Sequence, residues 1–185
     1  MLQTLLDSCA ALGVPYTRLK TDIKEVVFDV RKEDNPCSLC AKMRRGALCT
    51  ALSERGITKL ALGHHFDDAV ETFMMSLVFE GRLNCFKPVT YMSRADVTQI
   101  RPLLYIGEQR SANLAGQLDL PVVKSTCPMD HTSKRQEIKD LLTTLSAQYP
   151  DMRSKVFGAM QRLPLDGWGP APHERVKTRE RKKEE

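Results

Sequence analysis

Residues 60–72 read LALGHHFDDAVET, which describes a strand end, a polar turn and the start of a helix. Polar groups in such a turn stand outside the carboxyl end of a strand, where open parallel α/β sheets bind their ligands. Helix capping explains one aspartate, but it does not require two carboxylates preceded by two histidines. We therefore expect Gly63, His64, Asp67 and Asp68 to contact a nucleotide, Mg²⁺ or a substrate.

A second motif, PCSLCAKMRRG, occupies residues 36–46. Its two thiols, Cys37 and Cys40, lie three residues apart where a loop runs into a helix, and a cationic turn follows them. Helix N-termini and nearby Lys or Arg favour thiolate over thiol, and the thiolate is both metal ligand and nucleophile. A third cysteine, Cys127, precedes Pro128 in a later loop. Three such ligands leave a four-coordinate metal or cluster one ligand short, which suits chemistry better than a purely structural site.

The composition is that of an ordinary globular protein, with 42% hydrophobic and 28% charged residues in a chain of 185. No apolar stretch approaches membrane-spanning length and no signal sequence is recognisable, so we expect a cytoplasmic protein without a membrane partner. In a reducing compartment the six cysteines favour metal binding or catalysis over disulfides. The net charge of +5 is compatible with a polyanionic partner, although on charge alone a mildly basic surface is the better interpretation.

Apolar periodicity predicts helices alternating with strands, and hence a parallel α/β sheet with helices on both faces. The predicted helices are 2–12, 38–55, 67–79, 108–118, 133–148 and 152–160; the predicted strands are 15–20, 59–62, 89–93, 98–103 and 121–124, with the β-branched run 26–30 between them. The pattern starts on a helix, so the first βα unit of such a sheet is missing. We expect one domain over 1–168, incomplete at its N-terminus, and a charged, disordered tail over 169–185.

Four motifs, in this order, resemble the tRNA thiolases of the PP-loop ATPase superfamily, specifically the TtcA group that makes 2-thiocytidine. They are Cys37-Ser38-Leu39-Cys40 with Arg44-Arg45-Gly46, Gly63-His64-His65 with Asp67-Asp68, Arg101-Pro102-Leu103, and Cys127-Pro128. A lone C-x-x-C is weak evidence, whereas four motifs in this order and spacing are strong evidence. The resemblance runs from the first helix to about Trp168.

This resemblance implies a Rossmann-like adenine nucleotide α-hydrolase fold and a tRNA sulfurtransferase activity. ATP would adenylate a tRNA base oxygen, which sulfur then replaces. The resemblance also implies a [4Fe-4S] cluster on Cys37, Cys40 and Cys127, with ATP and Mg²⁺ near Gly63, His64, Asp67 and Asp68. The partners would be tRNA and a sulfur donor, either a cysteine desulfurase or sulfide, and a homodimer is compatible with it.

One departure from the family concerns its pyrophosphate loop, Ser-Gly-Gly-x-Asp-Ser, because this sequence contains no Gly-Gly pair. Such loops cradle phosphate with backbone N–H groups at a helix N-terminus. We therefore expect weak ATP binding by this chain. We also expect a truncated form of a longer enzyme rather than a degenerate relative, since every downstream motif retains sensible chemistry.

Two other functions remain open. In a structural Zn²⁺ protein, His131 or Cys49 would join the three cysteines to close a tetrahedral site. In another PP-loop enzyme, such as a lysidine synthetase, the three cysteines would have no assigned role. A degenerate homologue that binds tRNA without adenylating it is a variant of the main hypothesis.

The remaining chemically active side chains also have ordinary interpretations. Cys9, Cys49 and Cys85 fill space as small hydrophobes, and Trp168 packs down the C-terminal loop. The basic groups near the cysteine motifs are either solvated helix faces or a tRNA phosphate footprint. These groups are Lys42, Arg44 and Arg45 after the first pair of cysteines, and Lys134, Arg135 and Lys139 after the third cysteine.

Overall fold

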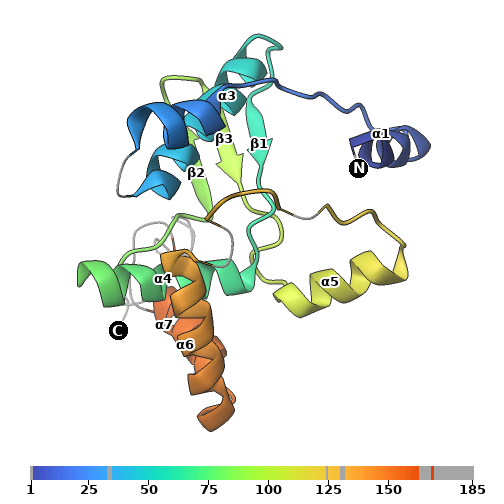
Figure 1. Ribbon diagram of the computed structural model, residues 1–185. Coiled ribbons are helices and arrows are strands. Elements are labelled where there is room, and N and C mark those ends of the chain that lie inside the picture. Colours follow the sequence, from blue (N-terminus) through green and yellow to red (C-terminus); the bar gives the residue numbers. More distant parts are fainter. Residues whose placement is uncertain (1, 33–34, 124, 130–131, 163–167, 169–185) are drawn as a thin grey trace, which may run out of the picture. The chain divides into compact units, whose positions relative to one another are not determined.

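The computed structural model describes residues 2–32, 35–123, 125–129, 132–162 and 168 (Figure 1). The chain divides into two compact units, which are described separately here. The first comprises Met1–Leu62, Thr90–Ile100 and Ile106–Ser133; the second comprises Gly63–Val89, Arg101–Tyr105 and Lys134–Glu185. Among the described residues, no helix has the length and apolar character needed to cross a membrane.

The first unit contains a three-stranded sheet with the strand order β1-β3-β2. Its strands are β1 (Lys59–Ala61), β2 (Val89–Met92) and β3 (Val97–Ile100). β1 runs parallel to β3, with Lys59 opposite Thr98 and Ala61 opposite Ile100. A tight turn joins β2 to β3 and holds Asp96 at φ 50°, a conformation that aspartate tolerates better than most residues. β1, β2 and β3 thus correspond to the predicted strands 59–62, 89–93 and 98–103.

Helix α3 (Pro36–Ser53) packs against β3 in the same unit and contacts the short helix α2 (Ile23–Glu25) and the π-helix η1 (Val26–Arg31). α3 ends close to the end of the predicted helix 38–55, and Gly56 follows it with φ 65°, a conformation that favours glycine after a helix. Helices α1 (Leu2–Ala11) and α5 (Glu108–Gln117) complete the unit. In Figure 1, α1 lies apart from the sheet.

Two predicted strands differ from the structure. Residues 15–20 and 121–123 form no strand, and the β-branched run 26–30 lies in the π-helix. An isolated strand has no partner for its backbone hydrogen bonds, so apolar, β-branched sequence alone does not hold it in a sheet. β1 is an edge strand, so no other described strand pairs with its outer side. The parallel sheet is therefore smaller than predicted.

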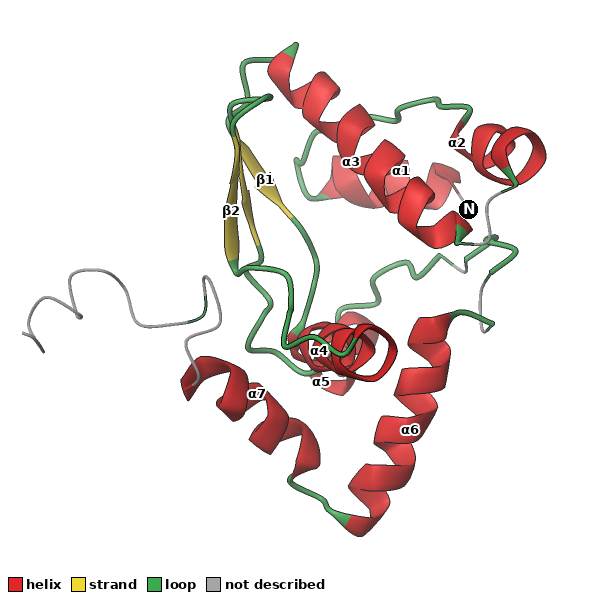
Figure 2. Ribbon diagram, turned by 90° about the vertical axis from the view of Figure 1, so that its left-hand side faces the viewer, coloured by secondary structure: helices red, strands yellow, loops and turns green. Residues whose placement is uncertain are grey.

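The second unit packs α4 (Phe66–Glu80) against both α6 (Lys134–Gln148) and α7 (Met152–Arg162), as Figure 2 shows. Its core joins buried side chains from all three helices with Leu104 and Trp168. The predicted helices in this region are all confirmed, and so is the packing role of Trp168, whose indole Nε1–H donates to the backbone carbonyl of Phe86 at 3.0 Å. Residues 169–185 and most of the loop before them lie outside the described residues.

Candidate functional site

The two cysteines of the C-x-x-C motif lie on the first turns of α3. Asn35 caps the helix by accepting the backbone N–H of Ser38 at 3.4 Å, and Pro36 occupies the first helical position, where its missing N–H costs no hydrogen bond. Cys37 and Cys40 are then separated by about one helical turn. Residues at this spacing share a helix face, so the local sequence presents both thiols on the same side.

Cys127 belongs to the same unit and follows α5 in a loop. Its backbone N–H donates to Oγ of Ser125 at 3.2 Å, which fixes the turn before Pro128. Burial raises the pKa of the Cys37 thiol, and the charges of Cys127 and Cys40 raise it further. The direction at Cys37 is opposite to the thiolate-favouring effect expected from the cationic turn, because burial and two like charges dominate.

The thiols of Cys37, Cys40 and Cys127 are chemically suitable ligands for an iron–sulfur cluster. All three cysteines are free thiols, and both Cys37 and Cys127 are exposed, so a cluster and a donor can reach them. Within the described ranges, no group of three or more His, Cys, Asp or Glu side chains is already gathered at metal-binding distance. Binding would therefore have to draw the thiols together.

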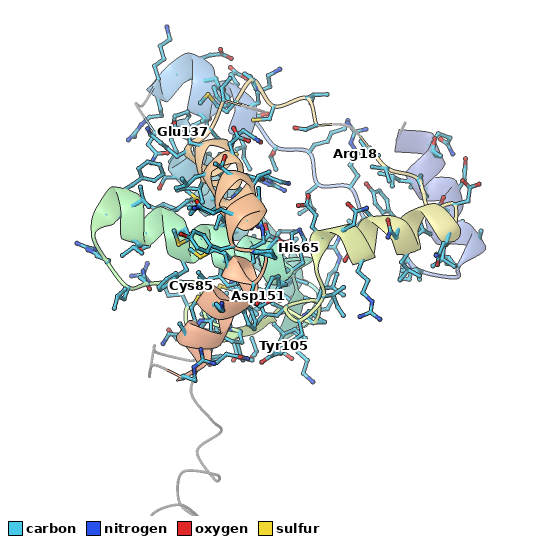
Figure 3. All side chains as sticks on the ribbon, turned by 90° about the horizontal axis from the view of Figure 1, so that it is seen from below. Arg18, His65, Cys85, Tyr105, Glu137 and Asp151 are labelled. Atoms are coloured by element: carbon cyan, nitrogen blue, oxygen red, sulfur yellow. The ribbon has the colours of Figure 1, made fainter. Side chains whose placement is uncertain are left out.

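The other cysteines make contacts typical of packing. Cys49 donates its S–H to the sulfur of Met92 at 3.9 Å, and Cys85 donates to the carbonyl of Ala69 at 3.5 Å. Burial raises the pKa of the Cys85 thiol to about 11, which makes it an inert thiol at neutral pH. Figure 3 labels Cys85 among the side chains. His131, the other residue considered as a fourth ligand, lies outside the described residues.

The basic residues after the C-x-x-C motif face solvent. Lys42, Arg44 and Arg45 are exposed on α3, which is the arrangement that a phosphate footprint requires. They share the first unit with the three cysteines. The structure thus keeps these three residues available for an anionic partner.

A capping box starts α4, and it uses one histidine and one aspartate of the LALGHHFDDAVET stretch. His65 is the N-cap: its Nδ1 accepts the backbone N–H of Asp68 at 3.3 Å, and the Asp68 carboxylate accepts the backbone N–H of His65 at 3.0 Å. The imidazole Nε2 of His65 also lies 3.3 Å from Asp68 Oδ2. Helix capping therefore accounts for both side chains.

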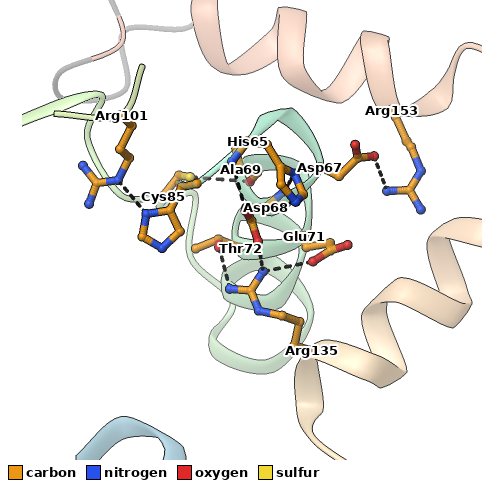
Figure 4. Close-up of polar contacts among 11 residues, drawn as sticks. His65, Asp67, Asp68, Ala69, Glu71, Thr72, Cys85, Arg101, Arg135 and Arg153 are labelled. Carbon is orange, nitrogen blue, oxygen red and sulfur yellow. Dashed lines mark hydrogen bonds and ion pairs between the residues drawn. The ribbon is translucent and has the colours of Figure 1, made fainter. Parts of the chain in front are cut away.

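Arginines from the other helices of the second unit neutralise both aspartates (Figure 4). Arg153 on α7 donates to Asp67 Oδ1 at 3.0 Å, and Arg135 on α6 lies 3.4 Å from Asp68 Oδ1. A Mg²⁺ ion bound by Asp67 and Asp68 would therefore have to compete with two guanidinium groups.

Arg135 makes its shortest ion pair with Glu71, one turn further along α4. Its NH1 donates to Glu71 Oε2 at 2.9 Å, and its NH2 donates to Thr72 Oγ1 at 3.1 Å. Glu71 is only 3% exposed, and its Oε1 is buried with no hydrogen-bond partner among the described residues. Burial raises the pKa of the Glu71 carboxyl despite the opposing effect of Arg135. Arg135 thus anchors α6 to α4 while its side chain stays 40% exposed.

His64, the first histidine of the pair, is held differently from His65. Arg101 Nε donates to His64 Nδ1 at 3.3 Å, and the His64 ring stacks on Phe86 with ring centroids 5.0 Å apart. The Arg101 guanidinium lies 4.5 Å from the Phe86 ring centroid and also donates to the backbone carbonyl of Lys87. Burial lowers the pKa of His64, and the charge of Arg101 lowers it further.

Three arginines acquire roles that sequence reasoning did not assign. The sequence shows Arg101 only as part of a motif, suggests a solvated or tRNA-contacting role for Arg135, and carries no signal for Arg153. Glu71 is the residue that indicates such a partner, because it is a charged side chain directly after the buried Val70. Because a buried carboxylate needs a cationic partner, it predicts a nearby Arg or Lys, although not which one.

The ligand turn at the start of α4 lies in the second unit, and the three cysteines lie in the first. The sequence model of the PP-loop domain matches residues 3–145. The chain therefore belongs to the PP-loop domain family.

Curated relatives include the tRNA-cytidine(32) 2-sulfurtransferase of Pelobacter propionicus, 34% identical over 85% of this chain and 60% of the relative. The enzyme of the same name from Alkalilimnicola ehrlichii is 37% identical over 83% of this chain and 50% of the relative. The chain thus spans 50–60% of the length of these two relatives. A solved structure, the U34-tRNA thiolase NcsA of Methanococcus maripaludis with its [4Fe-4S] cluster, is 26% identical with a TM-score of 0.68. It matches 89% of this chain and 58% of that protein.

Proposed function

We propose that this chain is the cysteine-bearing part of an ATP-dependent tRNA thiolase that converts a cytidine to 2-thiocytidine. The observation that carries this proposal is the placement of Cys37, Cys40 and Cys127 in one unit, with the first two on the first turns of α3. The names of the curated relatives support cytidine as the base, at position 32 of the tRNA. The cluster in the archaeal thiolase supports a [4Fe-4S] group as the cofactor.

In this proposal Cys37, Cys40 and Cys127 hold the cluster. A cluster bound by three thiolates has an iron without a protein ligand, to which a sulfur donor has access. The Cys37 thiol, whose pKa is raised, must lose its proton on binding, so cluster loading would be easier at higher pH. The sulfur donor itself would be sulfide or a cysteine desulfurase.

The exposed residues Lys42, Arg44 and Arg45 would bind tRNA phosphates on the unit that carries the cysteines. Phosphate contacts fix register and orientation, and they carry no base information. The basic part of α3 would therefore position the tRNA without choosing the base.

The turn after β1 would supply the nucleotide contacts. Gly63 has open space around it, since an added Cβ would meet no described atom within 4 Å, so packing does not explain the glycine. His64 would contribute a polar contact to ATP, and Asp67 and Asp68 would contribute contacts to Mg²⁺, with Arg135 and Arg153 limiting the negative charge at the two aspartates.

Anaerobic reconstitution with iron and sulfide tests this proposal. The loaded chain should carry about four iron atoms with broad brown absorbance, and it should bind unmodified tRNA. A chain that remains colourless and instead retains stoichiometric zinc would contradict the cluster and favour a structural metal site. Iron loading without any tRNA binding would contradict the thiolase role.

A further inference from the structure

The two adjacent histidines of the ligand turn differ in what their ring nitrogens do. Both nitrogens of His65 face Asp68: Nδ1 accepts its backbone N–H, and Nε2 lies 3.3 Å from its carboxylate. His64 uses Nδ1 alone, as the acceptor of the Arg101 Nε–H. Among the described residues, Nε2 of His64 has no protein hydrogen-bond partner. His65 is thus committed to the helix cap, whereas His64 keeps one ring nitrogen for another molecule.

Arg101 decides which protonation state of His64 the site contains. A guanidinium has only donors and stays charged at every accessible pH, so an imidazole nitrogen that pairs with it must be the unprotonated acceptor. With Nδ1 fixed as the acceptor, a neutral His64 carries its proton on Nε2. Protonating Nδ1 as well would break the hydrogen bond and place two cations side by side.

The surroundings of Arg101 make it a rigid partner for this task. Its guanidinium lies over the Phe86 ring and donates to the Lys87 carbonyl, so it is held from two further directions. Phe86 is fixed in turn, because Trp168 donates to its backbone carbonyl at 3.0 Å. The His64 ring stacks on the same phenyl group.

We propose that Arg101 is a positioning residue that holds His64 as the neutral Nε2–H tautomer, and that this N–H donates to an acceptor atom of the bound adenine nucleotide. The inference rests on the proposed function for the identity of the ligand and goes beyond it in assigning the donor. It gives the Arg101-Pro102-Leu103 motif a role. It also divides the histidine pair into a structural residue and a ligand-binding one.

Nitrogen-15 spectra of ring-labelled histidine test the tautomer directly, with His64→Gln identifying the His64 signals. In the wild-type chain at neutral pH, Nε2 of His64 should show the shift of a protonated nitrogen and Nδ1 that of an unprotonated acceptor. Arg101→Met removes the donor and should average the two signals toward a mixture of tautomers. The His65 signals should stay unchanged in this variant, which provides an internal control for folding.

Adding Mg·ATP at millimolar concentration should move the Nε2 signal of His64 and leave that of His65 in place. His64→Ala should weaken this binding by about twofold to tenfold, the range expected for one hydrogen bond, and His64→Gln should recover part of it through its amide N–H.

Two results would overturn the inference. A wild-type His64 that is protonated at Nδ1 cannot accept from Arg101, and this result counts even if Arg101→Met fails to fold. An Nε2 signal that ignores ATP while other residues respond would refute the donor role. Neither result would contradict the thiolase proposal, because that proposal is tested by iron loading and tRNA binding instead.

Discussion

NH1 of Arg153, on α7, lies 3.0 Å from Oδ1 of Asp67, on the first turn of α4. Together with the Arg135 contact to Asp68, this ion pair ties both aspartates of the ligand turn to the C-terminal helices of the second unit. The aspartates that would attract a metal thus also hold α4, α6 and α7 together. The electrostatics of this turn and the packing of the helices cannot be changed independently.

The cysteine assignment predicts which thiols hold iron. Replacing Cys37, Cys40 or Cys127 singly with Ala should remove most bound iron and the visible absorbance of the reconstituted chain. Cys9→Ala is the matched control and should leave both intact. Iron analysis and absorbance spectra measure the outcome, and full iron in all three single variants would show that the ligands lie elsewhere.

The exposed basic residues of α3 predict a salt-dependent affinity for tRNA. Exchanging Arg44 and Arg45 for Glu should weaken binding and flatten the slope of log affinity against log salt, because fewer counterions are released. Arg110→Glu, on the exposed surface of α5, serves as the control of equal charge change per residue. Filter binding across a salt series measures both quantities.

A tRNA affinity that ignores Arg44 and Arg45 but falls when residues 169–185 are removed would move the phosphate contacts to the tail. The sequence predicts the reverse order. A disordered segment loses conformational entropy with each contact it makes, so exchanging Lys182 and Lys183 should matter less.

The absent glycine-rich loop predicts weak nucleotide binding. The chain as given should bind ATP weakly or not at all in isothermal titration, because no Gly-Gly segment supplies backbone N–H groups to the phosphates. Micromolar affinity of the isolated chain would show that the ligand turn and α4 suffice without that loop.

The Arg135–Glu71 ion pair predicts a large loss of stability on removal of the arginine. Arg135→Gln should lower the free energy of unfolding by about 2–3 kcal/mol, because a carboxylate that is 3% exposed loses its charged partner. Lys155→Gln, which breaks an exposed pair with Asp151, should change it by less than about 1 kcal/mol. Urea unfolding of both variants decides this, and equal effects would mean that the buried pair contributes no more than a surface one.

The raised pKa of Glu71 predicts how its contribution changes with pH. The folded chain holds this proton more tightly than the unfolded chain, so stability gained from the protonated carboxyl is lost as the pH rises through the unfolded and then the folded pKa. Glu71→Gln cannot titrate. The wild-type protein should therefore gain stability relative to Glu71→Gln as the pH falls from neutral toward the model-peptide value of 4.5. Parallel unfolding curves over this range measure the difference, and a constant difference would contradict the prediction.

Much of the local structure could be predicted because it depends on neighbouring residues. Helix stops at Gly13 and Gly56, the hairpin before β3 and the placement of Cys37 near a helix start all follow from turn and capping chemistry. The predicted fold class agrees with membership of the PP-loop domain family.

The failures all involve partners distant in the sequence. Residues 15–20 have a strand's sequence, but a strand forms only where another strand pairs with it. The roles of Arg101, Arg135 and Arg153 depend on which carboxylate or ring the fold brings to each guanidinium. The sequence shows that all three are charged, but it does not rank their partners.

The uneven burial of the two units has a consequence for how the chain opens. Within the described residues, the first unit's fully buried apolar side chains are Val27 and Val97, whereas the second unit has a continuous core around Val70 and Leu142. Local opening is easiest where few apolar contacts must be broken. Amide hydrogens of the cysteine-bearing unit should therefore exchange with solvent long before those of α4 and α6. A metal that binds the three cysteines would thus bind the least protected part of the chain.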